Sequence, residues 1–479
     1  MNTKDRETSG ITLDPDNWSE LKSIGHRMLD DMFDYIEHVR ERPVWQPIPQ
    51  AARERFRREL PRKPTEIAEA YDEFSRYVAP YTSGNVHPGF MGWVHGGGTP
   101  VGMLAEMLAA GLNANLGGRD QMPIEVERQI VEWARQMFRF PAGSSGVFVT
   151  GTSAANLLAV LIARRASLGP KVRQEGVIAN GGKLRAYTSA DAHICIGQAM
   201  DISGLGSDAL CRIPVDAEHR MDLAALQERI TIDRVKGLKP FLVVGTAGTV
   251  DTGAIDDLSA LADLCAREKL RFHVDGAFGA LTVLSPELAP LVNGIERADS
   301  IAFDFHKWAQ VPYDAGFLLA RDGALHRQTF ASPAAYLRRE TRGLAGGSPW
   351  PSEYGPDLSR GFRALKTWFT LKTYGTDRIG AVIARTCELA RYLERRVLAE
   401  PRLEMLAPVP LNIVCFRYRA GDAVNARIVA DLHESGIAAP STTTIDGKLA
   451  IRAAFVNHRT QTGDIDALVD AVLRFGGSP

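Results

Sequence analysis

Between residues 85 and 320 the sequence alternates short apolar runs with helical segments, and this alternation restricts the possible folds more than any other feature. The runs expected to be strands are 147–150, 184–189, 241–245, 271–275, 300–305 and 316–320. The helices expected between them are 154–166, 223–230 and 257–268. Strands that alternate with helices form a mostly parallel sheet covered on both faces. The sequence therefore predicts an α/β fold.

The flanks of this region have different patterns. Residues 1–84 are charged and helix-patterned, with an amphipathic helix expected at 24–39, and they form an expected N-terminal helical segment. Residues 85–375 form the expected large domain, which includes a Gly/Pro-rich stretch at 343–356 that is typical of a mobile loop. Residues 376–479 predict a small α+β C-terminal domain that begins with a long helix.

The charges of the chain nearly cancel, because 56 Lys and Arg face 57 Asp and Glu and the net charge is −1. Nucleic-acid and anionic-membrane binders normally carry a basic excess, so neither partner is expected. No apolar run predicts a membrane span, and the polar start MNTKDRETSG lacks the apolar core of a secretory signal. The five cysteines are scattered and form no C-x-x-C pair, which favours a reducing compartment. We therefore expect a cytoplasmic enzyme.

The segment VFVTGTSAAN at 147–156 has the pattern of a strand, a tight turn and a helix. Glycine permits the turn, and Thr152 and Ser153 present hydroxyl and backbone N–H groups at the start of the helix. Such a helix N-terminus binds phosphate. The same residues would also serve as an ordinary helix cap, and the motif alone leaves both interpretations open.

The segment FHVDGA at 272–277 ends a strand with the carboxylate of Asp275, followed by small residues. A buried carboxylate is costly unless it is paired. Its partner could be a metal, a ribose hydroxyl or a cationic ring nitrogen. The small residues after Asp275 would let a flat ring approach closely.

The segment ADSIAFDFHKW at 298–308 places Lys307 at the end of an apolar strand, between His306 and Trp308. Burial lowers the pKa of a lysine and makes its amine nucleophilic, as Schiff-base chemistry requires. The alternative is a lysine whose stem packs at the strand end while its charge reaches solvent. His193 ends another expected strand and supplies an aromatic ring. Together, a phosphate cradle, a carboxylate and a Schiff-base lysine predict a site for pyridoxal 5'-phosphate (PLP).

In these motifs the sequence resembles the group II PLP-dependent decarboxylases, the family of aromatic-L-amino-acid, glutamate and histidine decarboxylases. The resemblance runs from about residue 85 to the C-terminus. Its most specific part is the pair HVD at 273–275 and HKW at 306–308. The other matching segments are NVHP (85–88), EVE (125–127), TGTSAAN (150–156), AH (192–193), TAGT (246–249), ADS (298–300), FRALK (362–366), IRA (451–453) and VNHRT (456–460).

The resemblance implies the aminotransferase-like fold type I and a homodimer with shared active sites. It implies a decarboxylation in which the substrate forms an external aldimine with PLP and loses CO2 to give a quinonoid. By the same resemblance, Lys307 forms the Schiff base, Asp275 pairs with the ring nitrogen and His193 stacks on the ring. Ala277 packs on the opposite face of the ring. The residues implied to hold the phosphate are Thr152, Ser153 and His306.

Several departures from the family pattern bear on the site. Ile194 follows the stacking histidine where the family often has serine, and Gly276 replaces an alanine. Asp304 stands where aromatic-amino-acid decarboxylases have an asparagine near the phosphate, and it is counted here among the expected cofactor contacts. The family also has a loop tyrosine that protonates the quinonoid carbon. This loop tyrosine has no obvious match in the sequence. The corresponding position falls near Pro351, and Tyr354, the tyrosine nearest to that position, is the candidate catalytic residue.

The expected substrate wall is polar. His95, Asn113, Asn115 and Arg119 match the family's substrate wall, and Arg452 is a candidate anchor for a substrate carboxylate. These residue types predict an amino-acid substrate with a polar or acidic side chain. Beyond that small molecule, the partner that we expect is a second subunit.

Several alternatives remain open from the sequence. A PLP-dependent aldehyde synthase or a transaminase would use the same scaffold, and fold alone does not separate these reactions. An NAD-linked oxidoreductase would use the G-x-G-x-x-A motif at 204–209, although no clear strand precedes it. A non-catalytic interaction protein would not need Lys307 and Asp275. The sequence has no H-E-x-x-H or cysteine motif that predicts a metal site.

Overall fold

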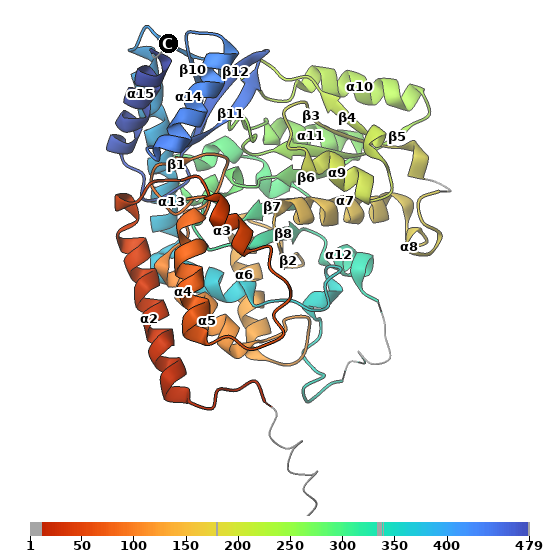
Figure 1. Ribbon diagram of the computed structural model, residues 1–479. Helices are drawn as coiled ribbons and strands as arrows, with labels where there is room; N and C mark the ends of the chain where they lie inside the picture. Colours follow the sequence, from red (N-terminus) through yellow and green to blue (C-terminus); the bar gives the residue numbers. More distant parts are fainter. Residues whose placement is uncertain (1–11, 179–180, 333–337, 339, 478–479) are drawn as a thin grey trace, which may run out of the picture.

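The computed structural model describes residues 12–178, 181–332, 338 and 340–477 of the chain. Its centre is a seven-stranded sheet in the order β2-β8-β7-β6-β5-β3-β4 (Figure 1). Its neighbouring strands pair in parallel except for β8, which is antiparallel to β2 and to β7. The strands are β2 (Ser145–Val149), β3 (Leu184–Ser189), β4 (Leu210–Ile213), β5 (Lys239–Thr246), β6 (Arg271–Asp275), β7 (Ser300–Asp304) and β8 (Gly316–Ala320). The expected mostly parallel α/β sheet is confirmed.

The central strands are buried on both faces, which explains their continuous apolar sequences. Every residue of β7 is buried, and its neighbours Ile301 and Ala302 belong to two different hydrophobic clusters. The helices that pack on the Ala302 face are α7 (Thr152–Leu168), α9 (Cys195–Ile202) and α12 (Gly323–Phe330). Those on the Ile301 face are α6 (Met122–Met137), α10 (Leu223–Val235) and α11 (Leu258–Glu268).

The C-terminal part of the chain forms a second sheet, in the order β1-β11-β12-β10-β9. Its C-terminal elements are α13 (Arg363–Leu398), β9 (Leu403–Met405), β10 (Ile413–Tyr418), α14 (Asp422–Ser435), β11 (Ala439–Ile445), β12 (Lys448–Ala454) and α15 (Thr462–Gly476). The long helix α13 is interrupted at Gly375, whose φ of 72° and ψ of 157° are not helical. The short strand β1 (Phe90–Met91) pairs in parallel with β11, so residues expected in the large domain also contribute to this sheet.

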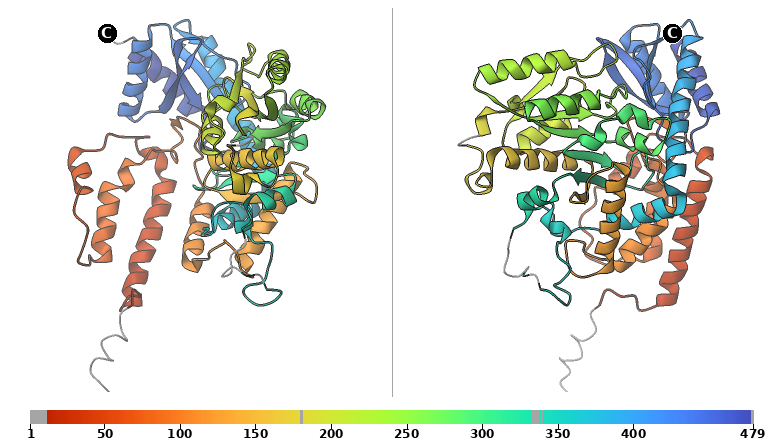
Figure 2. Two further views of the ribbon diagram at one scale, coloured as in Figure 1. Left: turned by 90° about the vertical axis from the view of Figure 1, so that its right-hand side faces the viewer. Right: turned by 180° about the vertical axis from the view of Figure 1, so that it is seen from behind.

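The first helices stand beside the body of the molecule (Figure 2). They are α2 (Trp18–Glu37), α3 (Gln50–Arg55) and α4 (Ile67–Tyr77). No residue of α2 is fully buried, so this segment has little core of its own. An ion pair of 2.8 Å between Arg40 and Asp464 joins it to the C-terminal part. Among the described residues, no helix is both long and apolar enough to cross a membrane.

The Gly/Pro-rich stretch at 343–356 is anchored near Trp350, which differs from the mobile loop expected there. Trp350 is 1% exposed, and its indole Nε1 donates a hydrogen bond of 2.7 Å to the carbonyl oxygen of Gly346. The guanidinium of Arg119 lies 4.6 Å from the centre of the same ring system. A short 3-10 helix, Pro351–Glu353, follows directly. Burial of a large aromatic ring thus fixes a segment whose composition predicts flexibility.

Candidate active site

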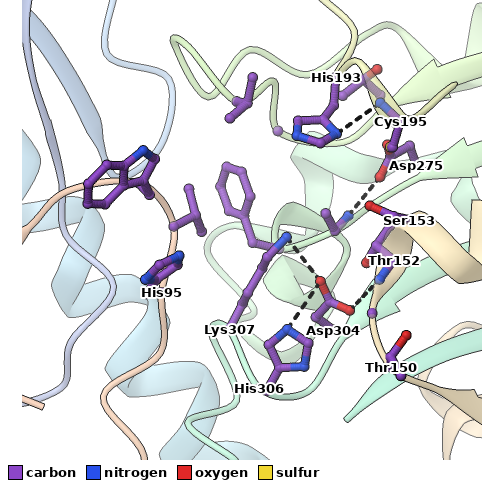
Figure 3. Close-up of a pocket in the computed structure, with 18 of the residues that line it drawn as sticks. His95, Thr150, Thr152, Ser153, His193, Cys195, Asp275, Asp304, His306 and Lys307 are labelled. Atoms are coloured by element: carbon purple, nitrogen blue, oxygen red, sulfur yellow. Dashed lines mark hydrogen bonds and ion pairs between the residues drawn. The ribbon is translucent and has the colours of Figure 1, made fainter. Parts of the chain in front are cut away.

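The carboxyl ends of the parallel strands meet at a cavity of about 350 Å³ (Figure 3). Open α/β sheets bind their ligands at this edge. The cavity is lined by Trp93, Val94, His95, Thr150, Gly151, Thr152, Ser153, His193, Cys195, Thr246, Gly248, Val250, Asp275, Ala277, Phe278, Asp304, His306, Lys307 and Tyr313. The structure thus brings together these candidates from the sequence: His95, Thr152, Ser153, His193, Asp275, Ala277, Asp304, His306 and Lys307.

The turn between β2 and α7 forms one wall of the cavity. Gly151 caps α7, and its carbonyl oxygen accepts hydrogen bonds from the N–H groups of Ala154 and Ala155. The N–H of Thr152 donates to Oδ1 of Asp304 at 2.7 Å. The hydroxyl of Thr152 is buried and has no hydrogen-bond partner in the described structure. An unpartnered buried hydroxyl beside a helix N-terminus fits a bound anion.

Asp275 ends β6 and is 4% exposed. Its Oδ2 accepts a hydrogen bond of 2.9 Å from Nδ2 of Asn156, and its Oδ1 accepts one of 3.2 Å from the N–H of Ala277. Burial raises the pKa of Asp275, while the charge of Lys307 acts in the opposite direction. A buried carboxylate is stabilised by a cation, and the protonated ring nitrogen of PLP would supply one if the cofactor were bound here.

A second buried side chain holds Asn156 in place. Nε2 of His273 lies 2.8 Å from Oδ1 of Asn156, and Nδ1 lies 2.8 Å from Oγ of Ser300. Burial lowers the pKa of His273 to about 4, so its ring is neutral and carries one N–H group. Because Asn156 directs its NH2 group to Asp275, its oxygen accepts, and we place the imidazole proton on Nε2.

Lys307 follows β7 after a short turn, and its Nζ lies 3.0 Å from Oδ2 of Asp304. The Lys307 side chain is 21% exposed, so its amine reaches the cavity while its stem is covered. Gly96 passes directly against this turn, because a Cβ at Gly96 would lie 2.5 Å from the carbonyl oxygen of Lys307. Glycine therefore allows the segment that carries His95 to approach the lysine.

Two of the three described histidines that line the cavity, His193 and His306, lie on the large-domain side of it (Figure 3). His193 follows β3, and its Nδ1 accepts a hydrogen bond of 3.2 Å from the N–H of Cys195. Nδ1 of His306 accepts one of 2.9 Å from the N–H of Ala315. Burial lowers the pKa of both rings, to about 4 for His306. Each ring is therefore neutral near pH 7, and a backbone amide fixes its orientation.

Three of the expected substrate residues do not line this cavity. Asn113 ends α5 (Pro100–Leu112) in the left-handed conformation, with a φ of 46°. Oδ1 of Asn115 accepts a hydrogen bond of 3.0 Å from the N–H of Arg360. Arg119 lies over Trp350, as described above. Asn115 and Arg119 are thus engaged with residues 350–360 and not with the cavity. The match to the family pattern did not reveal these contacts.

Arg452 and Tyr354 also lie outside the lining. Nε of Arg452 donates a hydrogen bond of 2.9 Å to the carbonyl oxygen of Val250, so the guanidinium supports the cavity wall from behind. The ring of Tyr354 packs against His326 with centroids 5.0 Å apart, and its carbonyl oxygen lies 2.8 Å from Nε2 of that histidine. The structure therefore places neither the expected carboxylate anchor nor the expected proton donor at the cavity.

Sequence reasoning missed several residues of the site. Trp93 and Tyr313 flank His95: the rings of Trp93 and His95 stack with centroids 5.9 Å apart, and Tyr313 meets His95 edge-on at 5.9 Å. Thr246 ends β5 and has a buried hydroxyl without a partner. Its position at a strand end could have indicated Thr246. Asn156 lies in the matching TGTSAAN segment, but no local signal indicates its contact with Asp275, and none indicates Trp93 or Tyr313.

The motif at 204–209 has the wrong context for a dinucleotide site. It follows α9 and leads into β4, whereas the fingerprint requires a strand before it and a helix after it. The structure therefore gives no support to the NAD-linked oxidoreductase, which depended on this motif.

The donor set of the cavity fits PLP in three respects. A helix N-terminus with an unpartnered hydroxyl suits the phosphate. A buried carboxylate at Asp275 suits the ring nitrogen, and a lysine amine at the cavity suits the aldehyde. The family model of the pyridoxal-dependent decarboxylase conserved domain matches residues 49–419. This chain belongs to the pyridoxal-dependent decarboxylases.

The decarboxylase is similar along most of its length to characterised relatives. It is 32% identical over 459 residues to aromatic-L-amino-acid decarboxylase from Bacillus atrophaeus, with 93% of each chain covered. It is 33% identical to L-2,4-diaminobutyrate decarboxylase from Rhizobium meliloti (strain 1021), over 86% of this chain and 83% of the relative. It is 28% identical to 3,4-dihydroxyphenylacetaldehyde synthase from Aedes aegypti, over 93% of this chain and 88% of the relative.

The fold of the decarboxylase is also that of a solved structure. The structure of Oryza sativa TDC with PLP and tryptamine superimposes with a TM-score of 0.89 at 24% identity, over 97% of this chain and 99% of that chain. The aminotransferase-like fold type I expected from the sequence is therefore confirmed. The chain is a PLP-dependent amino-acid decarboxylase, a carboxy-lyase, as the sequence predicted.

Proposed function

We propose that this decarboxylase acts on an aromatic L-amino acid and releases CO2 and the corresponding amine. The observation that supports this substrate class is the aromatic wall formed by Trp93, His95 and Tyr313. Aromatic side chains pair with such rings in offset or edge-on geometry. The relative from Bacillus atrophaeus carries the matching name.

The charges of the cavity disfavour an acidic substrate. Among the described residues that line it, Lys307 is the one lysine and arginine is absent. Nζ of Lys307 is already 3.0 Å from the carboxylate of Asp304. A substrate carboxylate in its side chain would thus enter a partly buried site without a free cation. This proposal replaces the polar or acidic side chain expected from His95, Asn113, Asn115 and Arg119, of which His95 alone lines the cavity.

The proposal assigns a role to each side chain that lines the cavity. Lys307 binds the cofactor covalently, and Asp275 keeps the ring nitrogen protonated. His193 and Ala277 enclose the ring, and the residues that hold the phosphate are Thr152, Ser153 and His306. PLP, when bound, supplies the electron sink that stabilises the carbanion left by CO2.

We also propose that the decarboxylase is a cytoplasmic homodimer. Exposed apolar side chains on α5 support a second subunit, since Met107 is 53%, Leu108 44% and Leu112 64% exposed. Such a patch marks an interaction surface. The five cysteines are all free, which suits a reducing compartment. Light scattering on the purified enzyme tests the dimer, and a monomer at micromolar concentration would contradict it.

An aldehyde synthase is the second candidate, favoured by the similarity to the enzyme from Aedes aegypti. The two reactions differ in their products. A simple decarboxylase releases one amine per CO2, whereas oxidative deamination releases an aldehyde, ammonia and peroxide.

The deciding experiment is a substrate panel with the PLP-loaded enzyme. The panel contains tryptophan, tyrosine, phenylalanine, 2,4-diaminobutyrate, glutamate and aspartate, and CO2, amine, aldehyde and peroxide are quantified for each. We expect the highest kcat/KM for an aromatic substrate, with amine and CO2 in equal amounts. Preference for an acidic or diamino substrate would contradict the aromatic assignment, and stoichiometric aldehyde would favour the second candidate.

A further inference from the structure

The carboxylate of Asp304 lies between Thr152 and Lys307 in the lining of the cavity (Figure 3). Asp304 is 2% exposed, and Oδ1 accepts the hydrogen bond of 2.7 Å from the N–H of Thr152. Oδ2 lies 3.0 Å from Nζ of Lys307. One buried anion thus engages both the first N–H of α7 and the amine of the lysine that binds the cofactor.

His306 presents a further donor to the same oxygen. Because Nδ1 of His306 accepts from the N–H of Ala315, the proton of the neutral ring is on Nε2. Nε2 lies 3.6 Å from Oδ2 of Asp304. The proton on Nε2 therefore faces the carboxylate across a gap slightly longer than a hydrogen bond.

Two of these donors, the N–H of Thr152 and Nε2 of His306, are ones that a phosphate group would use, and the positive charge of Lys307 would attract the same group. An ionised carboxylate only accepts hydrogen bonds, and so do the oxygens of a phosphate. The two anions cannot share one N–H at full strength, and they repel each other at short range in a buried site. In the described structure the hydroxyl of Thr152 is left for a phosphate, whereas the N–H of Thr152 is taken.

We propose that Asp304 is an internal anion that competes with the phosphate group of PLP for the N–H of Thr152 and for the Lys307 charge. Asp304 therefore weakens cofactor binding and is not one of the phosphate ligands. In the cofactor-free enzyme, the carboxylate of Asp304 bridges the N-terminus of α7 and the amine of Lys307. The inference concerns cofactor binding alone and holds whichever amino acid is the substrate.

The test compares cofactor-free wild type with Asp304→Asn, which keeps the shape of the side chain and removes its charge. PLP is titrated by absorbance to obtain Kd, and inorganic phosphate is titrated by the rise in Tm. We expect Asp304→Asn to bind both probes more tightly, by about tenfold or more. Inorganic phosphate has no aldehyde and does not react with Lys307. The phosphate titration therefore measures the effect of the Asp304 charge on anion binding separately from any change in the reactivity of Lys307.

Asp314→Asn is the matched control. Asp314 is in the same chain segment, and it pairs with Arg363 at 2.8 Å. We expect Asp314→Asn to leave both affinities within about twofold of wild type, because it touches neither Thr152 nor Lys307. Asp304→Ser replaces Asp304→Asn if the latter does not fold, as judged by circular dichroism.

Three outcomes would overturn the proposal. Unchanged binding of PLP in the Asp304 variant would show that the carboxylate does not compete with the cofactor, and weaker binding would show that it supports the cofactor. Tighter binding of PLP with unchanged binding of phosphate would show that Asp304 acts on the lysine alone.

Discussion

The amide of Asn156, on the first turns of α7, donates a hydrogen bond of 2.9 Å to the carboxylate of Asp275 at the end of β6. The same amide accepts from His273, two residues before Asp275 on that strand. A single side chain from the helix thus orients the carboxylate, and a neutral histidine orients that side chain. The orientation of Asp275 therefore depends on a polar chain that crosses from sheet to helix.

Asn156→Ala tests this arrangement. The change removes the amide partner of Oδ2 of Asp275 and of Nε2 of His273, which costs about 1–3 kcal/mol of unfolding free energy. We also expect a lower kcat and a changed absorbance of the bound cofactor. The control is Asn412→Ala, which removes a buried asparagine that donates 2.8 Å to the carbonyl oxygen of Phe455. It should lower Tm but leave the cofactor spectrum unchanged, and an altered spectrum in the control would contradict the assignment.

Asp275→Asn tests the charge of the carboxylate itself. The amide side chain does not stabilise a protonated ring nitrogen, so we expect turnover to fall by about 10²–10³. PLP occupancy should fall much less, because the phosphate contacts and the lysine are intact. Both quantities are measured on the same preparation, and wild-type turnover would show that the carboxylate has another role.

Lys307 is expected to carry the cofactor. Reduction of the PLP-loaded enzyme with borohydride should give a stable adduct on the peptide that contains Lys307, detected by mass spectrometry. Lys307→Ala should yield no adduct while it retains some PLP bound without a covalent link. An adduct on another lysine would disprove the central assignment.

The hydrophobic pattern of the sequence predicted those parts of the fold and of the site that depend on residues adjacent in the sequence. β3, β6 and β8 match the expected ranges because their apolar runs end sharply at polar or small residues. Lys307 and Asp275 are recognisable from the sequence because a charged residue at the end of an apolar strand is unusual. The sheet order and the antiparallel direction of β8 follow from pairing between distant segments, which periodicity does not encode.

Other features depend on tertiary contacts and could not be predicted. β1 has two residues, and its partner β11 lies at the other end of the chain. β4 is a partly exposed edge strand that follows a glycine-rich turn. Trp93 and Tyr313 reach the cavity because their segments meet at His95. The position of Tyr354 in the sequence suits the loop tyrosine, and only the packing of its ring against His326 shows that it lies outside the cavity.

Two tyrosines, Tyr336 and Tyr354, give a further prediction about the proton donor. Tyr354 packs against His326 outside the cavity, so Tyr354→Phe should keep the wild-type ratio of amine to aldehyde. Tyr336 precedes the Gly/Pro-rich stretch at 343–356 and lies outside the described residues. If the family's loop tyrosine corresponds to Tyr336, then Tyr336→Phe slows amine formation and raises aldehyde and peroxide. Product analysis of both variants decides, and a changed ratio in Tyr354→Phe would restore the original candidate.

The stability of the cofactor-free enzyme should fall in mild acid. Burial lowers the pKa of four histidines to about 4, namely His273, His306, His326 and His458. In the unfolded chain these groups take up protons below about pH 6.5, while the folded chain resists protonation until about pH 4. Their contribution to stability is therefore complete above pH 6.5 and is lost as the pH falls to 4. Asp256, whose pKa burial raises to about 6, acts in the opposite direction over much of this range.

The contribution of His326 to this pH dependence can be measured separately, because His326 lies outside the cavity and its substitution leaves the lining unchanged. Its Nδ1 lies 2.8 Å from Oγ of Ser145, and its Nε2 lies 2.8 Å from the carbonyl oxygen of Tyr354. A shift from 6.5 to about 4 corresponds to roughly 3 kcal/mol of unfolding free energy lost at the acid end. His326→Gln removes the titration, so its unfolding free energy should fall less steeply than that of wild type between pH 6.5 and 4.5. Urea unfolding at several pH values measures both slopes, and equal slopes would mean that His326 is already protonated in the folded enzyme or gains nothing from burial.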